Sequence, residues 1–134
     1  MSNWTHVAGI IRIDHVRVLD GEIMDFDNLI GKECLWESDM ETWKEQEEFP
    51  ERFLPMGSEG SLQKTVWVNP DWREIPAYTV SIFGDLRDHH DPDAILDWFK
   101  NVCDKLCIRN AVINAWNEWN GDRVWHYPKE DKSV

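Results

Sequence analysis

Hydrophobic and polar positions alternate in several short stretches of the chain, a pattern typical of β-strands. Residues 4–13 form the first predicted strand. Apolar residues fill most of both of its faces, which is typical of a strand covered on both sides at the centre of a sheet. Gly9 inside this strand allows the close approach of a group packed above it. Further strands are predicted over residues 62–68 and 77–83.

Helical spacing is strongest after residue 91. Asp91 has the residue type of a helix N-cap, and Pro92 suits the first helical position. Apolar residues then recur every three or four positions as far as Leu106. A shorter helix is predicted over residues 25–30, so we expect one long amphipathic helix and one short one.

The last predicted element is a β-hairpin formed by residues 111–119 and 122–127. Its turn is placed at Asn120-Gly121, the strongest sequence signal for a two-residue hairpin loop. This turn predicts three cross-strand pairs, Trp119 with Asp122, Glu118 with Arg123, and Trp116 with Trp125. The second is an opposite-charge pair and the third an aromatic pair on the same face, and both kinds stabilise paired strands.

The order of these elements predicts an α+β fold built on a split βαβ arrangement. Right-handed crossovers place the first and third strands in the middle of the sheet. We therefore expect a ferredoxin-like sheet in the order 2-3-1-4-5, with helices on one face and an extra strand from the C-terminal hairpin. Residues 1–134 are predicted to form a single domain, from which residues 36–60 make a surface excursion.

Charge and composition narrow the function classes. The chain has 26 acidic and 14 basic residues, a formal net charge of −12, and nine tryptophans. This charge repels phosphate backbones, so we expect no direct binding of nucleic acid. An acidic surface instead speeds encounter with basic proteins. No membrane span or signal peptide is predicted, and three cysteines exclude a fully paired disulfide framework. These features favour a cytoplasmic protein.

The surface excursion is the predicted site of partner binding because it combines clustered charge with aromatic residues. Carboxylates steer a basic partner towards the surface, and aromatic rings anchor it there. The residues with these roles are Trp36, Glu41, Trp43, Glu45, Glu47, Glu48 and Phe49. The leading hypothesis is therefore a non-catalytic interaction protein that binds a basic site on another protein, with no cofactor. That partner could itself handle nucleic acid.

Two alternatives remain open. The chain could be a structural protein that self-associates through a tryptophan-bearing sheet, on which Trp116 and Trp125 would share a face. It could also be a metal-assisted hydrolase, since carboxylates and imidazoles ligate metals. The residues available for that chemistry are Asp85, Asp88, His89 and His90. Adjacent histidines point apart in many conformations, so we expect no bound metal there.

Two stretches carry a resemblance to a known group of proteins. Residues 3–12 (NWTHVAGIIR) and 55–62 (PMGSEGSL) resemble short proteins encoded by bacteriophages and prophages. The resemblance implies a small accessory protein that acts by binding, in a host cytosol. It implies no catalytic or ligand-binding residue.

Overall fold

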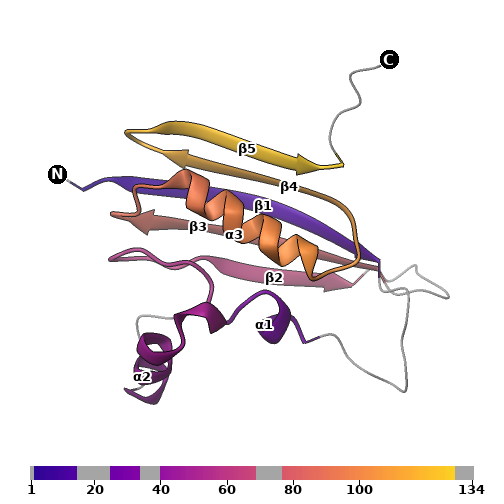
Figure 1. The fold of residues 1–134 in the computed structure, drawn as a ribbon, viewed down its shortest axis with the longest axis horizontal. Coiled ribbons are helices and arrows are strands. Elements are labelled where there is room, and N and C mark those ends of the chain that lie inside the picture. The colour runs from indigo at the N-terminus through magenta and orange to yellow at the C-terminus, as the bar shows by residue number, and fades with distance from the viewer. Residues whose placement is uncertain (1, 15–24, 34–39, 69–76, 129–134) are drawn as a thin grey trace.

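The computed structural model describes residues 2–14, 25–33, 40–68 and 77–128. Within these residues, five antiparallel strands form one sheet in the order β2-β3-β1-β4-β5 (Figure 1). The strands are β1 (Trp4–Asp14), β2 (Gln63–Val68), β3 (Ala77–Arg87), β4 (Ile108–Asn117) and β5 (Gly121–Tyr127). The predicted α+β class, strand order and central first strand are confirmed.

Helix α3 (Pro92–Asp104) covers one face of the sheet and completes the core. Its N-cap is Asp91, whose side chain accepts hydrogen bonds from two backbone N–H groups, as the sequence predicts. Phe99 is fully buried at the centre of the helix–sheet contact. A Cβ atom at Gly9 would lie 3.3 Å from the Phe99 ring and 3.2 Å from Ile113, so the absence of a side chain at Gly9 permits this close packing.

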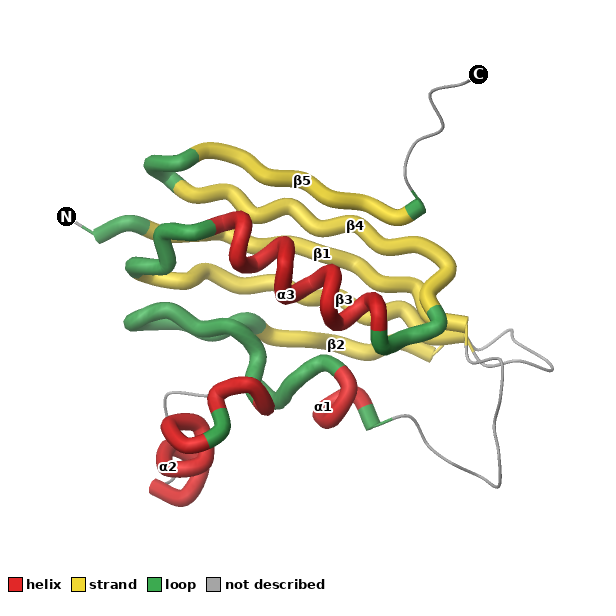
Figure 2. The backbone as a smooth tube through the Cα atoms, viewed as in Figure 1, coloured by secondary structure: helices red, strands yellow, loops and turns green. Residues whose placement is uncertain are grey.

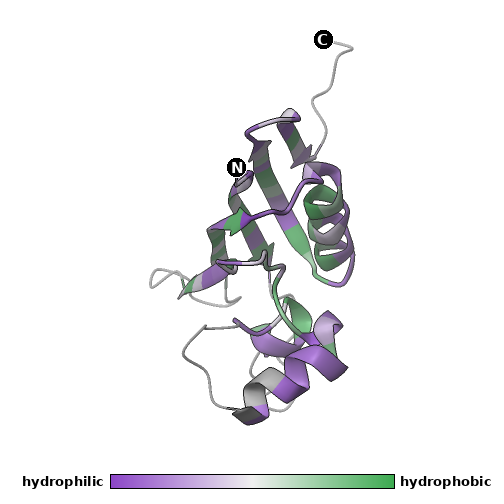
Figure 3. Ribbon diagram, turned by 90° about the vertical axis from the view of Figure 1, so that its left-hand side faces the viewer, coloured by the Kyte–Doolittle hydropathy of each residue, from purple (hydrophilic) through white to green (hydrophobic). Residues whose placement is uncertain are grey.

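The opposite face of the sheet is open, which corrects the prediction that the first strand is covered on both sides. Burial along β1 alternates: Val7, Gly9 and Ile11 are buried, whereas Ala8 and Ile10 are exposed. In the side view of Figure 3, α3 lies against one face, and no described helix lies against the other. A central position in the sheet therefore does not bring cover on both faces.

Two further helices and a 3₁₀ turn precede β2. They are α1 (Phe26–Leu29), α2 (Met40–Glu48) and η1 (Pro50–Arg52). None of the three lies over the sheet centre (Figure 1). α1 nevertheless packs against the main core at the β2 edge through Phe26 and Leu29, and the Phe26 ring contacts Tyr78 of β3. The expectation of helices on one face therefore holds for α3 and, at the edge, for α1. Ile30, directly after α1, and Leu54, shortly after η1, are buried in the main core. The connection from η1 then runs to the end of β3 before it returns to β2 (Figure 2).

The C-terminal hairpin is present, but its predicted register is wrong. Asn117 pairs with Gly121, and residues 118–120 form a three-residue loop. Trp116 consequently faces Asp122, and Trp125 faces Ile113. The remaining pairs are also displaced, since Arg123 faces Ala115 and Glu118 and Trp119 lie in the loop.

The buried side chain of Asn117 explains this register. Its Oδ1 accepts hydrogen bonds from the backbone N–H groups of Trp119 at 2.9 Å and Asn120 at 2.8 Å, which closes the loop early. The N–H of Glu118 donates to the carbonyl of Trp4 and not to β5. Gly121 takes the positive φ, +86°, that ends the loop. Contacts with the rest of the fold thus override the local preference of the Asn-Gly pair.

Candidate functional site

The open face of the sheet carries a continuous group of exposed apolar side chains. We call this group the open-face patch, and it consists of Phe83, Ile10, Val112, Val124 and Trp116. Each of the five is between 42% and 55% exposed. Ile10 lies directly opposite Val112, and the register places the other members at diagonal cross-strand positions. The patch therefore spans four neighbouring strands, β3, β1, β4 and β5.

Three carboxylates lie at the end of this patch where Trp116 is found. Asp85 and Glu118 flank His6: Nδ1 of His6 lies 2.6 Å from Asp85, and Nε2 lies 3.8 Å from Glu118. The His6 ring stacks on Trp116 with 5.1 Å between the ring centroids. The third carboxylate, Asp122, accepts a hydrogen bond from the Asn114 amide. We call Asp85, Glu118 and Asp122 the acidic end of the open face.

A buried polar network holds the same end of the sheet in place. Asn3, Thr5 and Asn117 are fully buried. The Asn117 amide donates to the Thr5 hydroxyl at 2.9 Å and to the His89 carbonyl at 3.1 Å, which ties β4 to β1 and to the loop before α3. Burial lowers the pKa of His89, so this side chain is neutral in the folded protein at neutral pH.

The four residues considered for metal binding are not brought together. Asp85 belongs to β3 and contacts His6, whereas Asp88 accepts a hydrogen bond from the Ser58 hydroxyl. That bond, together with one from the Asn3 N–H, lowers the pKa of Asp88. His89 is partly buried, and His90 stacks on Trp119. Among the described residues, no three His, Cys, Asp or Glu side chains are placed to hold a metal ion.

The predicted partner-binding segment is described only in part. Glu41, Glu47 and Glu48 are exposed on or at the end of α2. Glu45 is engaged within the protein, 3.1 Å from Lys32 and 3.8 Å from Arg52. The Arg52 guanidinium also covers the Phe49 ring at 3.9 Å, so two of the seven predicted contact residues have intramolecular partners. Trp36 and the side chain of Trp43 lie outside what the structure describes.

The two tryptophans expected to share a face point to opposite sides of the sheet. Trp125 lies on the α3 side, with its ring centroid 5.8 Å from that of Phe99 in an edge-on contact. Trp116 belongs to the open-face patch. A shared aromatic platform of Trp116 and Trp125 is therefore excluded, because the three-residue loop reverses the facing of one tryptophan relative to the other.

The cysteines of α3 and its C-terminal end do not form a reactive pair. Cys103 is buried, and burial raises the pKa of its thiol to about 12. A thiol with so high a pKa is not a nucleophile at neutral pH. Cys107 lies beyond the end of α3 and is exposed. The core role expected for a buried cysteine therefore fits Cys103.

The open-face patch is the feature that the sequence analysis missed. Its signal was present, because apolar residues occupy both alternating sets of positions in β1 and β4. That pattern is equally compatible with a strand covered on both faces and with one whose second face is left for a partner. The number of long amphipathic helices decides between them, and only one was predicted with strong helical spacing.

Comparison with protein-family models, with curated proteins and with solved structures finds no match for this chain. In the part of the chain that the structure describes, no helix has the length and apolar character needed to cross a membrane.

Proposed function

We propose that this protein is a non-catalytic interaction protein whose open-face patch binds a protein partner with apolar and basic side chains. The observation that carries the proposal is the contiguity of the patch. Single exposed apolar residues are common on protein surfaces, but a contiguous group bordered by polar residues is typical of an interaction surface. Here five such residues lie across four strands, with a charged group at one end.

Charge complementarity favours a basic partner over a second copy of the chain. The chain carries a net charge of −12, so two copies repel each other at long range. The acidic end places Asp122 directly opposite Trp116, and Glu118 and Asp85 around His6, which stacks on Trp116. Lysine or arginine side chains on a partner would meet these carboxylates while apolar side chains cover the patch. Tryptophan is a frequent anchor residue in such interfaces.

The surface excursion, residues 36–60, remains a second proposed contact with the partner. Its exposed glutamates lie beyond the β2 edge, outside the open face, so they would act by steering and not by direct packing against the patch. Long-range steering changes the association rate and weakens as salt rises. Charge reversal at Glu47 and Glu48 should therefore slow association, whereas a change within the patch should speed dissociation.

We also propose that the fold is ferredoxin-like. Two features support this assignment: β1 and β2 are separated in the sheet by β3, and β3 and β4 are separated by β1. Each crossover thus skips one strand, as in a split βαβ unit. β5 adds a further strand at the edge, next to β4.

The test compares two matched valine substitutions. Val112 lies in the patch and is 44% exposed, whereas Val66 lies on the opposite face at the β2 edge and is 40% exposed. We expect Val112→Asp to abolish capture of a basic protein from cell extract, and Val66→Asp to retain it. Purified partner should then bind the parent chain and Val66→Asp with similar dissociation rates.

Size-exclusion chromatography with light scattering distinguishes binding of a basic partner from self-association. The proposal expects a monomer at micromolar concentration. A dimer that Val112→Asp dissociates and Val66→Asp does not would replace the basic partner with a second copy, and would favour the self-associating alternative.

A further inference from the structure

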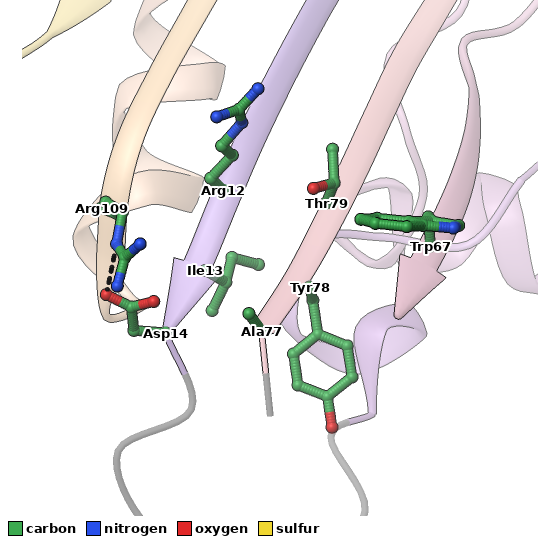
Figure 4. Close-up of a pocket in the computed structure, with 8 residues that line it drawn as sticks. All are labelled: Arg12, Ile13, Asp14, Trp67, Ala77, Tyr78, Thr79 and Arg109. Carbon is green, nitrogen blue, oxygen red and sulfur yellow. Dashed lines mark hydrogen bonds and ion pairs between the residues drawn. The ribbon is translucent and has the colours of Figure 1, made fainter. Parts of the chain in front are cut away.

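A small pocket lies at the end of the sheet opposite the acidic end, where β1 and β2 finish and β3 and β4 begin. Its volume is about 250 Å³, slightly below the range of roughly 300–1,000 Å³ that is usual for ligand sites. The described residues that line it (Figure 4) are Arg12, Ile13, Asp14, Trp67, Ala77, Tyr78, Thr79 and Arg109. We call it the arginine pocket, and its size suits a small molecule.

The pocket is positively charged in a protein that is strongly acidic. Arg109 is the extra residue of an irregularity in the β1–β4 pairing, and its Nε donates to Asp14 at 3.0 Å. Among the described lining residues, this ion pair leaves the guanidinium of Arg12 as the uncompensated charge. The described part of the lining therefore carries one net positive charge, which suits a monoanion.

Arg12 differs from the other arginines that the structure describes. Arg52, Arg87, Arg109 and Arg123 each lie within 4 Å of a carboxylate. No ion-pair partner of Arg12 occurs among the described residues. An uncompensated guanidinium presents a planar array of donors that matches a carboxylate in two hydrogen bonds.

Trp67 and Thr79 supply the rest of the recognition surface. The register places Trp67, Thr79 and Arg12 in one row across β2, β3 and β1. Two strand spacings separate the backbones of Trp67 and Arg12, about 10 Å. The Trp67 ring lies towards Thr79 in Figure 4 and is 55% exposed. A ligand whose flat ring packs on the indole can therefore extend over the Thr79 hydroxyl towards the guanidinium.

We propose that the arginine pocket binds a small aromatic carboxylic acid. The carboxylate would pair with Arg12, and the ring would stack on Trp67. A phosphate dianion fits less well, because Asp14 lies in the same lining and the described lining residues supply only one net positive charge. This site is separate from the open-face patch and does not require a protein partner.

The test is an NMR titration of the full chain with 3-phenylpropionate, observed at the indole N–H of Trp67. The Trp67→Phe variant assigns that resonance. We expect saturable shifts with a dissociation constant on the order of 1 mM, as for a ligand of few atoms. The neutral 3-phenylpropionamide, acetate and inorganic phosphate should each bind at least about tenfold more weakly than 3-phenylpropionate. The amide lacks the negative charge, and acetate and phosphate lack the ring.

Two arginine variants complete the test. Arg12→Gln should weaken binding of 3-phenylpropionate about tenfold or more, the loss expected for a charge-assisted pair. Arg52→Gln, a change of the same kind outside the pocket, should leave it unaltered. Equal binding of the amide, or unchanged binding by Arg12→Gln, would overturn the proposal, because stacking on Trp67 without anion recognition would then account for the shifts.

Discussion

Replacement of Asn117 by alanine should lower the free energy of unfolding by about 2–4 kcal/mol. The side chain makes four hydrogen bonds between 2.8 and 3.1 Å, two as acceptor and two as donor. Each contributes on the order of 1 kcal/mol. The two N–H groups of the loop can regain water, whereas the buried partners Thr5 and the His89 carbonyl cannot regain it fully, which sets the range.

Urea unfolding followed by tryptophan fluorescence measures this loss, and Asn114→Ala is the matched control. Asn114 lies on the same strand but on the open face, where its side-chain amide donates to the exposed Asp122. Its replacement should change the free energy of unfolding by less than about 0.5 kcal/mol, as for most surface changes. If Asn117→Ala were no more destabilising than Asn114→Ala, the role of the buried amide in setting the hairpin register would be refuted.

Three further predictions follow from the core and the pKa values. Burial lowers the pKa of His89 below its ordinary value of 6.5, so His89 binds a proton more tightly in the unfolded chain than in the folded protein. The free energy of unfolding should therefore fall as the pH drops below about 6.5. The His89→Asn variant should show a weaker pH dependence when urea unfolding is measured at pH 5–8. Gly9→Ala should destabilise by about 1–2 kcal/mol through contact with Phe99, and a cycle with Phe99→Leu should show that part of this cost is relieved. Trp125→Ala should lower the free energy of unfolding by about 2–3 kcal/mol in the same assay, and Trp116→Ala by less than about 1 kcal/mol. Equal losses would contradict the placement of the two tryptophans on opposite faces of the sheet.

Much of the fold could be predicted from local sequence patterns. The cap at Asp91 with Pro92, the helical spacing after it and the alternation in the strands are short-range features, and they are sufficient to predict strand order through the rules of crossover handedness. The prediction that Gly9 permits close packing is also confirmed, by Phe99.

The hairpin register could not be predicted from the turn alone, because it depends on the side chain of Asn117, whose hydrogen-bond partners lie far from the turn in the sequence. Asn120-Gly121 is a strong local preference, but Asn117 is fixed by Thr5 and by the His89 carbonyl, which are far away in the sequence. The candidate site was misjudged for a related reason. Alternation shows which residues share a face, as for Ile10 and Val112, but not whether another element covers that face.

The most direct test of the proposed function is methyl NMR of the chain with and without its captured basic partner. The methyl groups of Ile10, Val112 and Val124 report on the open-face patch, and those of Val66 and Val68, which are similarly exposed on the other side of the sheet, serve as internal controls. We predict that partner binding shifts or broadens the first three and leaves the two controls unchanged. Changes confined to Val66 and Val68 would contradict the assignment of the open face as the binding surface, and so would the absence of any change in both groups.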